Sequence, residues 1–472
     1  MYKVLIRPLQ IEDAKVSYKW RNDPEIWKYT GHKPDKIIDK KTEQAWLKEK
    51  LKEKDSFRFA ILADDTYIGN IQITDINQNE TGEYHIFIGE KLFWGKGIAY
   101  LATLQIIRFA KNILNLKELF LTVNPNNYPA IRVYEKCGFK KFNDTIQMKL
   151  DLNTNINPMV SVFVMTYNHE KYISQAIESI LAQKTNFDFD IVVGEDYSND
   201  RTREILLDYQ AQYPGKFKLI LQNINVGPSQ NQIDTLNACT GKYVAICEGD
   251  DYWTDPYKLQ KQVDYLEKNQ NVSFVATNYY IYNEITNKTK RVSIPKQIDF
   301  ITLLKRKNLI PTLTTCIRSE YIFDYIREVN PKEKNWPVGD YPLWLYLSQM
   351  GKIGVIPEYT ANYNKRQNSV CHYSDIKKQY QFYLNVIDIA KFYSIEYGIS
   401  TSIKQRIKRN KIETLINYGY SLKDPKLMRK WIKYYFYNQK LVPMKGVIKY
   451  FLLILENKCY LFKIKFLTTI AD

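Results

Sequence analysis

Three acidic residues follow directly after a short apolar run, and this junction constrains the fold more than any other stretch. The run Lys242–Ile246 has the length and composition of a buried strand. It continues as Cys247-Glu248-Gly249-Asp250-Asp251-Tyr252-Trp253. In an α/β protein, a strand that ends in clustered acids marks a ligand or metal site. The alternative is a solvated acidic turn before a helix that starts near Asp255.

Carboxylates at this spacing repel one another unless a cation lies between them. A hard divalent ion, held jointly by protein carboxylates and substrate phosphates, is the partner that suits oxygen ligands. The acidic stretch therefore favours Mg²⁺ or Mn²⁺ at the end of this strand.

The same pattern, an apolar run followed by polar residues, recurs in the preceding sequence. Apolar runs that predict strands end in polar residues and alternate with predicted helices; these runs are Val160–Met165, Asp190–Gly194, Phe217–Leu221 and Tyr243–Cys247. Such alternation predicts a mostly parallel sheet with a nucleotide site along the carboxyl ends of its strands. The chain has no GxGxxG sequence and no P-loop, which excludes a dinucleotide fold and a P-loop NTPase.

The polar residues at these strand ends resemble the inverting GT-A glycosyltransferases of family 2 over residues 159 to about 370. The matching motifs are Thr166-Tyr167-Asn168, Asp196-x-Ser198-x-Asp200-x-Thr202, Asn225-x-Gly227 and Glu248-x-Asp250-Asp251. The resemblance implies that Thr166, Tyr167 and Asp196 bind the nucleoside of a nucleotide-diphospho-sugar. It also implies that Glu248-Gly249-Asp250 replaces the Asp-x-Asp motif of the family.

In that family Asp250 and Asp251 would hold the metal on the diphosphate, and Glu248 would contact the donor through a longer side chain than Asp. An inverting transfer needs one base that deprotonates the acceptor hydroxyl. Asp340, ahead of a predicted helix, is the candidate, and the alternative is that it only caps this helix. Arg366 lies in a loop with Tyr363 and His372 and is the candidate diphosphate ligand, because a guanidinium suits phosphate.

The first segment, residues 1–152, also alternates strands and helices. A glycine pair in Phe93-Trp94-Gly95-Lys96-Gly97-Ile98 opens a long apolar helix, and free N–H groups at such a helix start hold phosphate. With Ile6-Arg7-Pro8, Lys19-Trp20-Arg21-Asn22-Asp23 and the ending Asn127-x-x-Ala130…Tyr134-Glu135-Lys136-Cys137-Gly138-Phe139, the segment resembles the GNAT N-acetyltransferases.

The GNAT resemblance implies acetyl-CoA as co-substrate. The backbone of Trp94, Gly95, Lys96, Gly97 and Ile98 would hold its pyrophosphate. Asn127 would contact the pantetheine arm, and Tyr134 would protonate the leaving thiolate. Glu83 and His85 are candidate bases, with His85 favoured as a structural strand residue. Leu92 stands where members of the family often carry Gln or Arg.

A polar stretch, residues 153–158, predicts a linker between the GNAT-like segment and the glycosyltransferase-like segment 159–375. From residue 376 to 472 the sequence predicts basic amphipathic helices, which carry most of the net charge of +17. Their basic faces suit either an anionic membrane surface or a helical unit packed on the core. No recognised nucleic-acid motif accompanies the charge.

The six cysteines form no CxxC pair, no signal peptide precedes the first strand, and no apolar run spans a bilayer, so we expect a cytoplasmic protein. A peripheral contact with the inner face of the cell membrane is one of the two interpretations of the basic helices. The expected class is α/β in both sheet-forming segments. We expect a bifunctional enzyme of surface-polysaccharide assembly, which acetylates an amino sugar and transfers a sugar to a glycan or lipid-linked acceptor. The alternatives are an acetyltransferase-like domain that only binds, or one that acts on protein amines.

Overall fold

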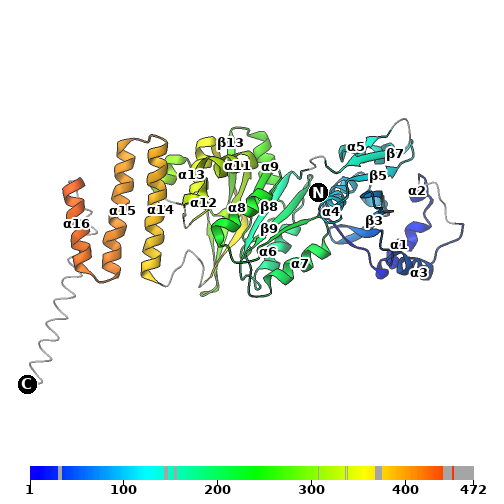
Figure 1. The fold of residues 1–472 in the computed structure, drawn as a ribbon, viewed down its shortest axis with the longest axis horizontal. Helices are drawn as coiled ribbons and strands as arrows, with labels where there is room; N and C mark the ends of the chain where they lie inside the picture. The colour runs from blue at the N-terminus through cyan, green and yellow to red at the C-terminus, as the bar shows by residue number, and fades with distance from the viewer. Residues whose placement is uncertain are drawn as a thin grey trace, which may run out of the picture.

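The computed structural model describes residues 1–29, 35–142, 147–153, 157–306, 308–334, 336, 338–366, 375–439 and 449–450. Two mixed sheets follow each other along the chain, and three long helices form a row beyond the second sheet (Figure 1). The predicted α/β class with a helical C-terminal region is confirmed. Within the described ranges no helix is both long enough and apolar enough to cross a membrane. His372 and most of the helix predicted at 447–455 lie outside these ranges.

The first sheet has seven strands in the order β1-β2-β3-β4-β5-β7-β6. The strands are β1 Val4–Pro8, β2 Phe57–Ala63, β3 Thr66–Thr74, β4 Thr81–Ile88, β5 Glu118–Thr122, β6 Lys140–Lys141 and β7 Gln147–Asp151. β4 and β5 pair in parallel, and the other neighbours pair antiparallel. The helices are η1 Ile11–Asp13, α1 Ala14–Arg21, α2 Pro24–Trp27, α3 Lys40–Lys50, η2 Lys91–Phe93, α4 Ile98–Asn112 and α5 Tyr128–Lys136.

Helix α4 is buried along most of its length, including the polar side chains of Thr103, Gln105 and Arg108. A helix buried on all sides needs a packing partner on each face. The first sheet supplies one partner, through a core that contains Ile6, Ile71 and Ile106. On the other side, Arg108 contacts Asp188 and the Gly215 carbonyl, which lie just before two strands of the second sheet.

The second sheet has the strand order β10-β9-β8-β11-β15-β13-β16-β12, with β14 paired to β13. The strands are β8 Val160–Thr166, β9 Phe189–Glu195, β10 Phe217–Leu221, β11 Tyr243–Ile246, β12 Tyr252–Trp253, β13 Val272–Asn283, β14 Lys288–Val292, β15 Thr315–Arg318 and β16 Lys352–Lys365. The first four predicted strands are β8 to β11, and they pair in parallel as the sequence predicts. Thr166 lies opposite Glu195 in the register, so the polar ends of β8 and β9 meet at one edge.

Helices cover both faces of the second sheet, and further helices lie beyond one end of it. They are α6 Ile173–Leu181, α7 Thr202–Gln212, α8 Pro228–Ala238, α9 Lys258–Lys268, α10 Phe300–Arg306, η3 Thr312–Thr314, α11 Ser319–Val329, α12 Pro331–Lys334, α13 Asp340–Met350, α14 Ile376–Glu396, α15 Thr401–Ser421 and α16 Pro425–Gln439. Ile387 and Ile389 of α14 and Ile407 of α15 join the core of the second sheet. A smaller core of Ile412, Ile416 and Met428 holds α16 to α15.

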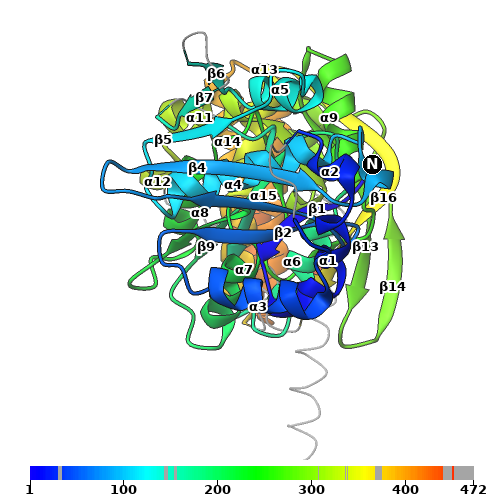
Figure 2. The same cartoon turned by 90° about the vertical axis from the view of Figure 1, so that its right-hand side faces the viewer.

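The two sheets meet through buried contacts, and Figure 2 views the molecule from the end that carries the first sheet with α1 and α3. Leu5 and Leu62 of the first sheet belong to the same apolar cluster as Val160 and Ile191 of the second. Arg108 of α4 forms a buried ion pair with Asp188, just before β9. The segment predicted as a linker therefore joins two units in direct contact.

Candidate active sites

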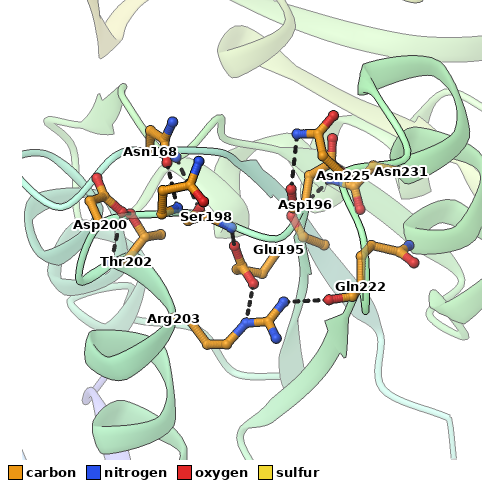
Figure 3. A network of polar contacts seen from close by, with 12 residues as sticks. Asn168, Glu195, Asp196, Ser198, Asp200, Thr202, Arg203, Gln222, Asn225 and Asn231 are labelled. Atoms are coloured by element: carbon orange, nitrogen blue, oxygen red, sulfur yellow. Dashed lines mark hydrogen bonds and ion pairs between the residues drawn. The ribbon is translucent and has the colours of Figure 1, made fainter.

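Backbone and side-chain hydrogen bonds tie together the loops after β8 and β9. Asn168, which adopts the left-handed conformation with φ 54°, accepts from the Asn199 N–H at 2.9 Å and donates its own N–H to Ser198 Oγ at 3.0 Å. Glu195 accepts from the Ser198 N–H and from Arg203, whose guanidinium also contacts Gln222 (Figure 3). This hydrogen-bond network fixes the ends of β8 and β9, where the sequence analysis places the candidate nucleoside-binding residues.

Asp196 lies at the centre of the same edge. Its two carboxylate oxygens accept from the N–H groups of Val226 at 2.7 Å and Gly227 at 3.0 Å, and its carbonyl accepts from Asn225 (Figure 3). Burial raises the pKa of Asp196 although these hydrogen bonds oppose the shift. A carboxylate has about four acceptor positions, so the predicted contact with a nucleobase N–H stays open to Asp196.

The acidic loop after β11 is held by the end of β16. The Asn364 N–H donates to Asp251 at 2.8 Å, and the Asn364 amide donates to the carbonyl of Asp250 at 2.7 Å. Arg366, two residues on, forms an ion pair with the Asp250 carboxylate. Two of the predicted residues, Asp250 and Arg366, are thus in direct contact.

Burial and mutual repulsion shape the charges of this loop. Burial, with the charges of Asp250 and Asp340 adding to it, raises the pKa of Glu248 to about 7. Burial and the neighbouring carboxylates raise the pKa of Asp251 well above its ordinary value. Burial is the main cause of both shifts and the neighbouring carboxylates add to it, so a cation bound at this loop would offset both.

Asp340 is the first residue of α13. Its carboxylate accepts from the Tyr341 N–H at 2.7 Å and from the Asn308 amide. Burial raises the pKa of Asp340, and the charge of Asp340 makes a small contribution to the raised pKa of Glu248. The structure thus brings Asp340 into the electrostatic neighbourhood of the acidic loop, across 90 residues of sequence.

Several buried polar atoms at this edge have no hydrogen-bond partner among the described residues: Thr166 Oγ1, His169 Nδ1, Asn231 Oδ1, Glu248 Oε2 and Arg366 Nε. Such atoms are costly to leave unpaired and mark a place where a polar ligand belongs. Thr166 is 2% exposed, whereas Tyr167 is 40% exposed at the rim.

The residues fit a hard divalent ion. Glu248 presents an unpartnered buried oxygen, and Asp250 already attracts a cationic group. In the described part of the chain, no three His, Cys, Asp or Glu side chains are gathered closely enough to hold a metal by themselves. Mg²⁺ and Mn²⁺ bound with substrate phosphates need only one or two protein carboxylates, so further oxygen ligands would come from a donor.

His169 and Asn364 are the residues that the sequence analysis missed. His169 follows the Thr166-Tyr167-Asn168 motif directly, and a Cβ on Gly249 would lie 2.9 Å from its Nδ1. Gly249 is therefore required where the acidic loop packs against His169 and Thr166. The adjacency of His169 to the motif is a signal that the sequence contains; for Asn364, in a strand that the sequence did not predict, there is none.

The glycine loop before α4 has the geometry of an anion-binding helix start. Gly95 and Gly97 have φ values of 70° and 77°, and a Cβ on either would meet nothing within 4 Å. No side chain caps the fifteen-residue helix α4 at Gly97. Trp94 donates its indole N–H to the Ile88 carbonyl at 2.8 Å, which fixes the loop against β4. Open space in front of an uncapped helix start suits a phosphate.

Tyr134 is buried, with its ring against Tyr84 and Phe139, and burial raises its pKa to about 12. Glu83 and His85 lie 3.6 Å apart, and His85 also contacts Thr74 at 3.0 Å. Neighbouring residues of a strand point to opposite faces, so Glu83 and Tyr84 diverge from β4. Glu83 therefore lies on the other face of the sheet from the Tyr84–Tyr134 contact.

Asn127 uses its side chain locally. It caps α5 by accepting from the Ala130 N–H at 3.3 Å, and Tyr128, the next residue, is 65% exposed. A donor amide group remains on the same side chain for a ligand.

Comparison with known proteins agrees with both resemblances. Residues 161–327 match glycosyl transferase family 2, and residues 3–140 match the acetyltransferase (GNAT) domain. An uncharacterized glycosyltransferase of Methanocaldococcus jannaschii is 30% identical over 234 residues, which cover 48% of this chain and 78% of that protein. The chain belongs to glycosyltransferase family 2. It carries a GNAT domain ahead of the family 2 domain.

Two further relatives of the family 2 domain differ in how much of them is matched. An uncharacterized protein of Mycobacterium tuberculosis is 33% identical over 228 residues, or 46% of this chain, and the match spans 63% of that protein's length. UDP-Glc:alpha-D-GlcNAc-diphosphoundecaprenol beta-1,3-glucosyltransferase of Escherichia coli is 27% identical over 256 residues, which cover 52% of this chain and 94% of that enzyme.

Proposed function

We propose that the family 2 domain, residues 159–375, transfers a sugar with inversion from a nucleotide-diphospho-sugar to a glycan or lipid-linked acceptor. The observation that carries the proposal is the convergence of unpartnered polar atoms from β8, β11 and β16 at one sheet edge, beside the acidic loop. The name of the Escherichia coli relative, a glucosyltransferase acting on a diphosphoundecaprenol-linked sugar, supports this class of donor and acceptor and a role in surface-polysaccharide assembly.

In this proposal the strand ends bind the nucleoside, with Thr166, Tyr167 and Asp196 in contact with base and ribose. Glu248 would contact the donor through its buried Oε2, which has no hydrogen-bond partner among the described residues. Asp250 and Asp251 would hold Mg²⁺ or Mn²⁺ on the diphosphate. When bound, the ion stabilises the negative charge that develops on the leaving diphosphate.

Asp340 is the proposed base. It would accept the proton of the acceptor hydroxyl while that oxygen attacks the anomeric carbon from the face opposite the diphosphate. A raised pKa makes the carboxylate a better proton acceptor than an exposed aspartate. Arg366 would contact the diphosphate oxygens with its planar donor groups.

We also propose that residues 1–152 transfer an acetyl group from acetyl-CoA to the amine of an amino sugar. The backbone of Trp94, Gly95, Lys96, Gly97 and Ile98 would hold the pyrophosphate, with Asn127 on the pantetheine arm. Tyr134 would protonate the leaving thiolate; its raised pKa keeps the phenol protonated at neutral pH. Glu83 is the proposed base, through a path around β4 or a bridging water.

The basic outer faces of α15 and α16 support a peripheral contact with an anionic membrane, and we propose a cytoplasmic location on that ground. Lys408, Arg409, Lys430 and Lys433 are exposed on these helices. Each such cation near an anionic surface contributes about 1 kcal/mol. The contact would bring the transferase to a lipid-linked acceptor.

A thermal stabilisation screen tests the donor proposal. The full chain is melted with a panel of nucleotide-diphospho-sugars, with and without Mn²⁺, beside Asp250→Asn. We expect one nucleoside to stabilise the wild type only when Mn²⁺ is present, and to have little effect on the variant. Stabilisation of neither protein by any donor would refute the proposal.

The acetyl-transfer proposal has its own test. The full chain is incubated with acetyl-CoA and free or nucleotide-linked amino sugars, with Tyr134→Phe as control, and N-acetylated product is followed by mass spectrometry. We expect product with the wild type and a loss of rate with the variant. Acetylation of peptides alone would show that the domain acts on protein amines.

A further inference from the structure

Arg366 has three partners of different chemistry at the edge of the second sheet. Its guanidinium forms an ion pair with Asp250 and lies 3.2 Å from His169 Nε2, measured from Nη2. The guanidinium carbon also lies 5.2 Å from the centre of the Tyr172 ring. One partner is a charged candidate metal ligand, and the other two are neutral groups that follow β8.

The contact between Arg366 and His169 defines how the imidazole is protonated. A guanidinium has donors only, so His169 Nε2 must accept and Nδ1 must carry the hydrogen. Burial is the largest of the effects that lower the pKa of His169, in keeping with a neutral ring. A neutral His169 can accept a hydrogen bond from the Arg366 guanidinium while Asp250 keeps its ion pair with the same group.

Arg366 and a divalent ion would compete for Asp250. The guanidinium already takes Oδ2 of this carboxylate, and a bound divalent ion would repel the positive charge beside it. On losing Asp250, the guanidinium keeps its two neutral neighbours, His169 and Tyr172. Its Nε, which is buried and has no hydrogen-bond partner among the described residues, could then donate to an anion.

We infer that Arg366 is an exchangeable internal cation, which occupies Asp250 until a metal arrives, and that His169 then positions its guanidinium toward the donor diphosphate. The inference rests on the proposed glycosyltransferase function and adds a positioning residue, His169, that the family motifs do not include. It also implies that the Arg366 guanidinium neutralises the Asp250 carboxylate between turnovers, when no metal is bound.

Metal binding without donor tests the exchange. Free Mn²⁺ is titrated against the full chain by electron paramagnetic resonance, for wild type, Arg366→Gln and the control Arg327→Gln, whose arginine pairs with Asp324 on the surface. Arg366→Gln should bind Mn²⁺ at least about fivefold tighter, the order expected when a charge-assisted hydrogen bond no longer has to be broken. The control should match the wild type.

The same variant should lose affinity for a diphosphate. Inorganic pyrophosphate in the presence of Mg²⁺ serves as a probe that needs no knowledge of the base, and its binding is measured by calorimetry. We expect Arg366→Gln to bind it about tenfold more weakly, because a guanidinium–phosphate contact is lost. Misfolding would weaken both interactions. Tighter binding of Mn²⁺ together with weaker binding of pyrophosphate in the same variant would therefore not come from misfolding.

A matched pair of substitutions tests His169. His169→Gln keeps an acceptor near the place of Nε2, whereas the shorter side chain of His169→Asn reaches only as far as Nδ1. We expect the Asn variant to bind Mg²⁺-pyrophosphate several-fold more weakly and to raise the donor KM more than it lowers kcat, and the Gln variant to restore most of the loss. Equal behaviour of the two variants at equal melting temperature would overturn the role of His169.

The outcomes separate the inference from the function on which it rests. If the wild type binds Mn²⁺ and Arg366→Gln binds it no tighter, the exchange is refuted while metal-dependent transfer stands. If the wild type binds no Mn²⁺ and transfers sugar equally well in EDTA, the metal part of the proposed function is refuted, and the exchange with it.

Discussion

Replacing Arg108 by Met should destabilise the protein more than any surface change, because Arg108 joins the two sheets. Its guanidinium pairs with Asp188 through both terminal nitrogens and donates from Nε to the Gly215 carbonyl at 2.7 Å. The two side chains are 8% and 4% exposed. Methionine keeps most of the volume of the arginine stem and removes only the charge and its hydrogen bonds.

The size of the destabilisation follows from the charge that remains unpaired on Asp188. Removing one member of a buried ion pair costs about 3–5 kcal/mol, since the remaining charge stays buried without compensation. Lys216, buried close by, partly compensates Asp188, so we expect the lower end of this range. For units of this size, about 3 kcal/mol corresponds to a fall of roughly 6–12 °C in melting temperature.

Differential scanning calorimetry of the full chain measures this change. Arg132→Met, an exposed arginine in the same domain, is the control and should melt within about 2 °C of the wild type. Asp188→Asn added to Arg108→Met should recover at least about half of the loss, because it removes the stranded charge. If Arg108→Met melts like its control, the buried ion pair does not hold the two sheets together.

Three further predictions concern other groups. Burial lowers the pKa of Lys216 to about 7 from 10.5, so the unfolded chain binds a proton there that the folded protein lacks. The melting temperature of the wild type relative to Lys216→Met should therefore rise as the pH rises from about 7 toward 10.5, and a difference independent of pH would contradict the buried lysine. Asp340→Asn should lower kcat about 10²- to 10⁴-fold with donor affinity retained, whereas a loss confined to donor Kd would make Asp340 a binding residue. Changing Lys430 and Lys433 to Gln should weaken sedimentation with anionic liposomes at low salt, and wild-type protein that does not sediment would favour a purely packed helical unit.

The candidate donor-binding edge of the second sheet could be predicted because its geometry is local and repetitive. Apolar runs of strand length, each followed by polar residues, determine that Thr166, Asp196 and Glu248 end neighbouring parallel strands. The carboxyl ends of such strands necessarily lie at one edge. The glycine pair Gly95 and Gly97 is a similar case, since positive φ at both residues is a property of the turn itself.

The features that could not be predicted depend on contacts between distant segments, which local sequence patterns do not encode. Asn364 meets Asp251 across 113 residues, through β16, a strand that shows no clear alternation in the sequence. Arg108 is a buried charge inside a largely apolar helix, and its partner Asp188, just before β9 of the other sheet, explains its burial. A charged residue in a helix that is otherwise apolar on all sides is nevertheless a usable sign of a second packing partner.

Release of nucleoside diphosphate is the measurement that tests the central claim most directly. The full chain, Asp250→Asn and Tyr134→Phe are incubated with the donor selected by stabilisation, in Mn²⁺ or in EDTA, and the free nucleoside diphosphate is quantified. We predict release by the wild type and Tyr134→Phe in Mn²⁺ only, and at least about a hundredfold less by Asp250→Asn. Equal release by Asp250→Asn, or equal release in EDTA, would contradict metal-assisted sugar transfer at this sheet edge.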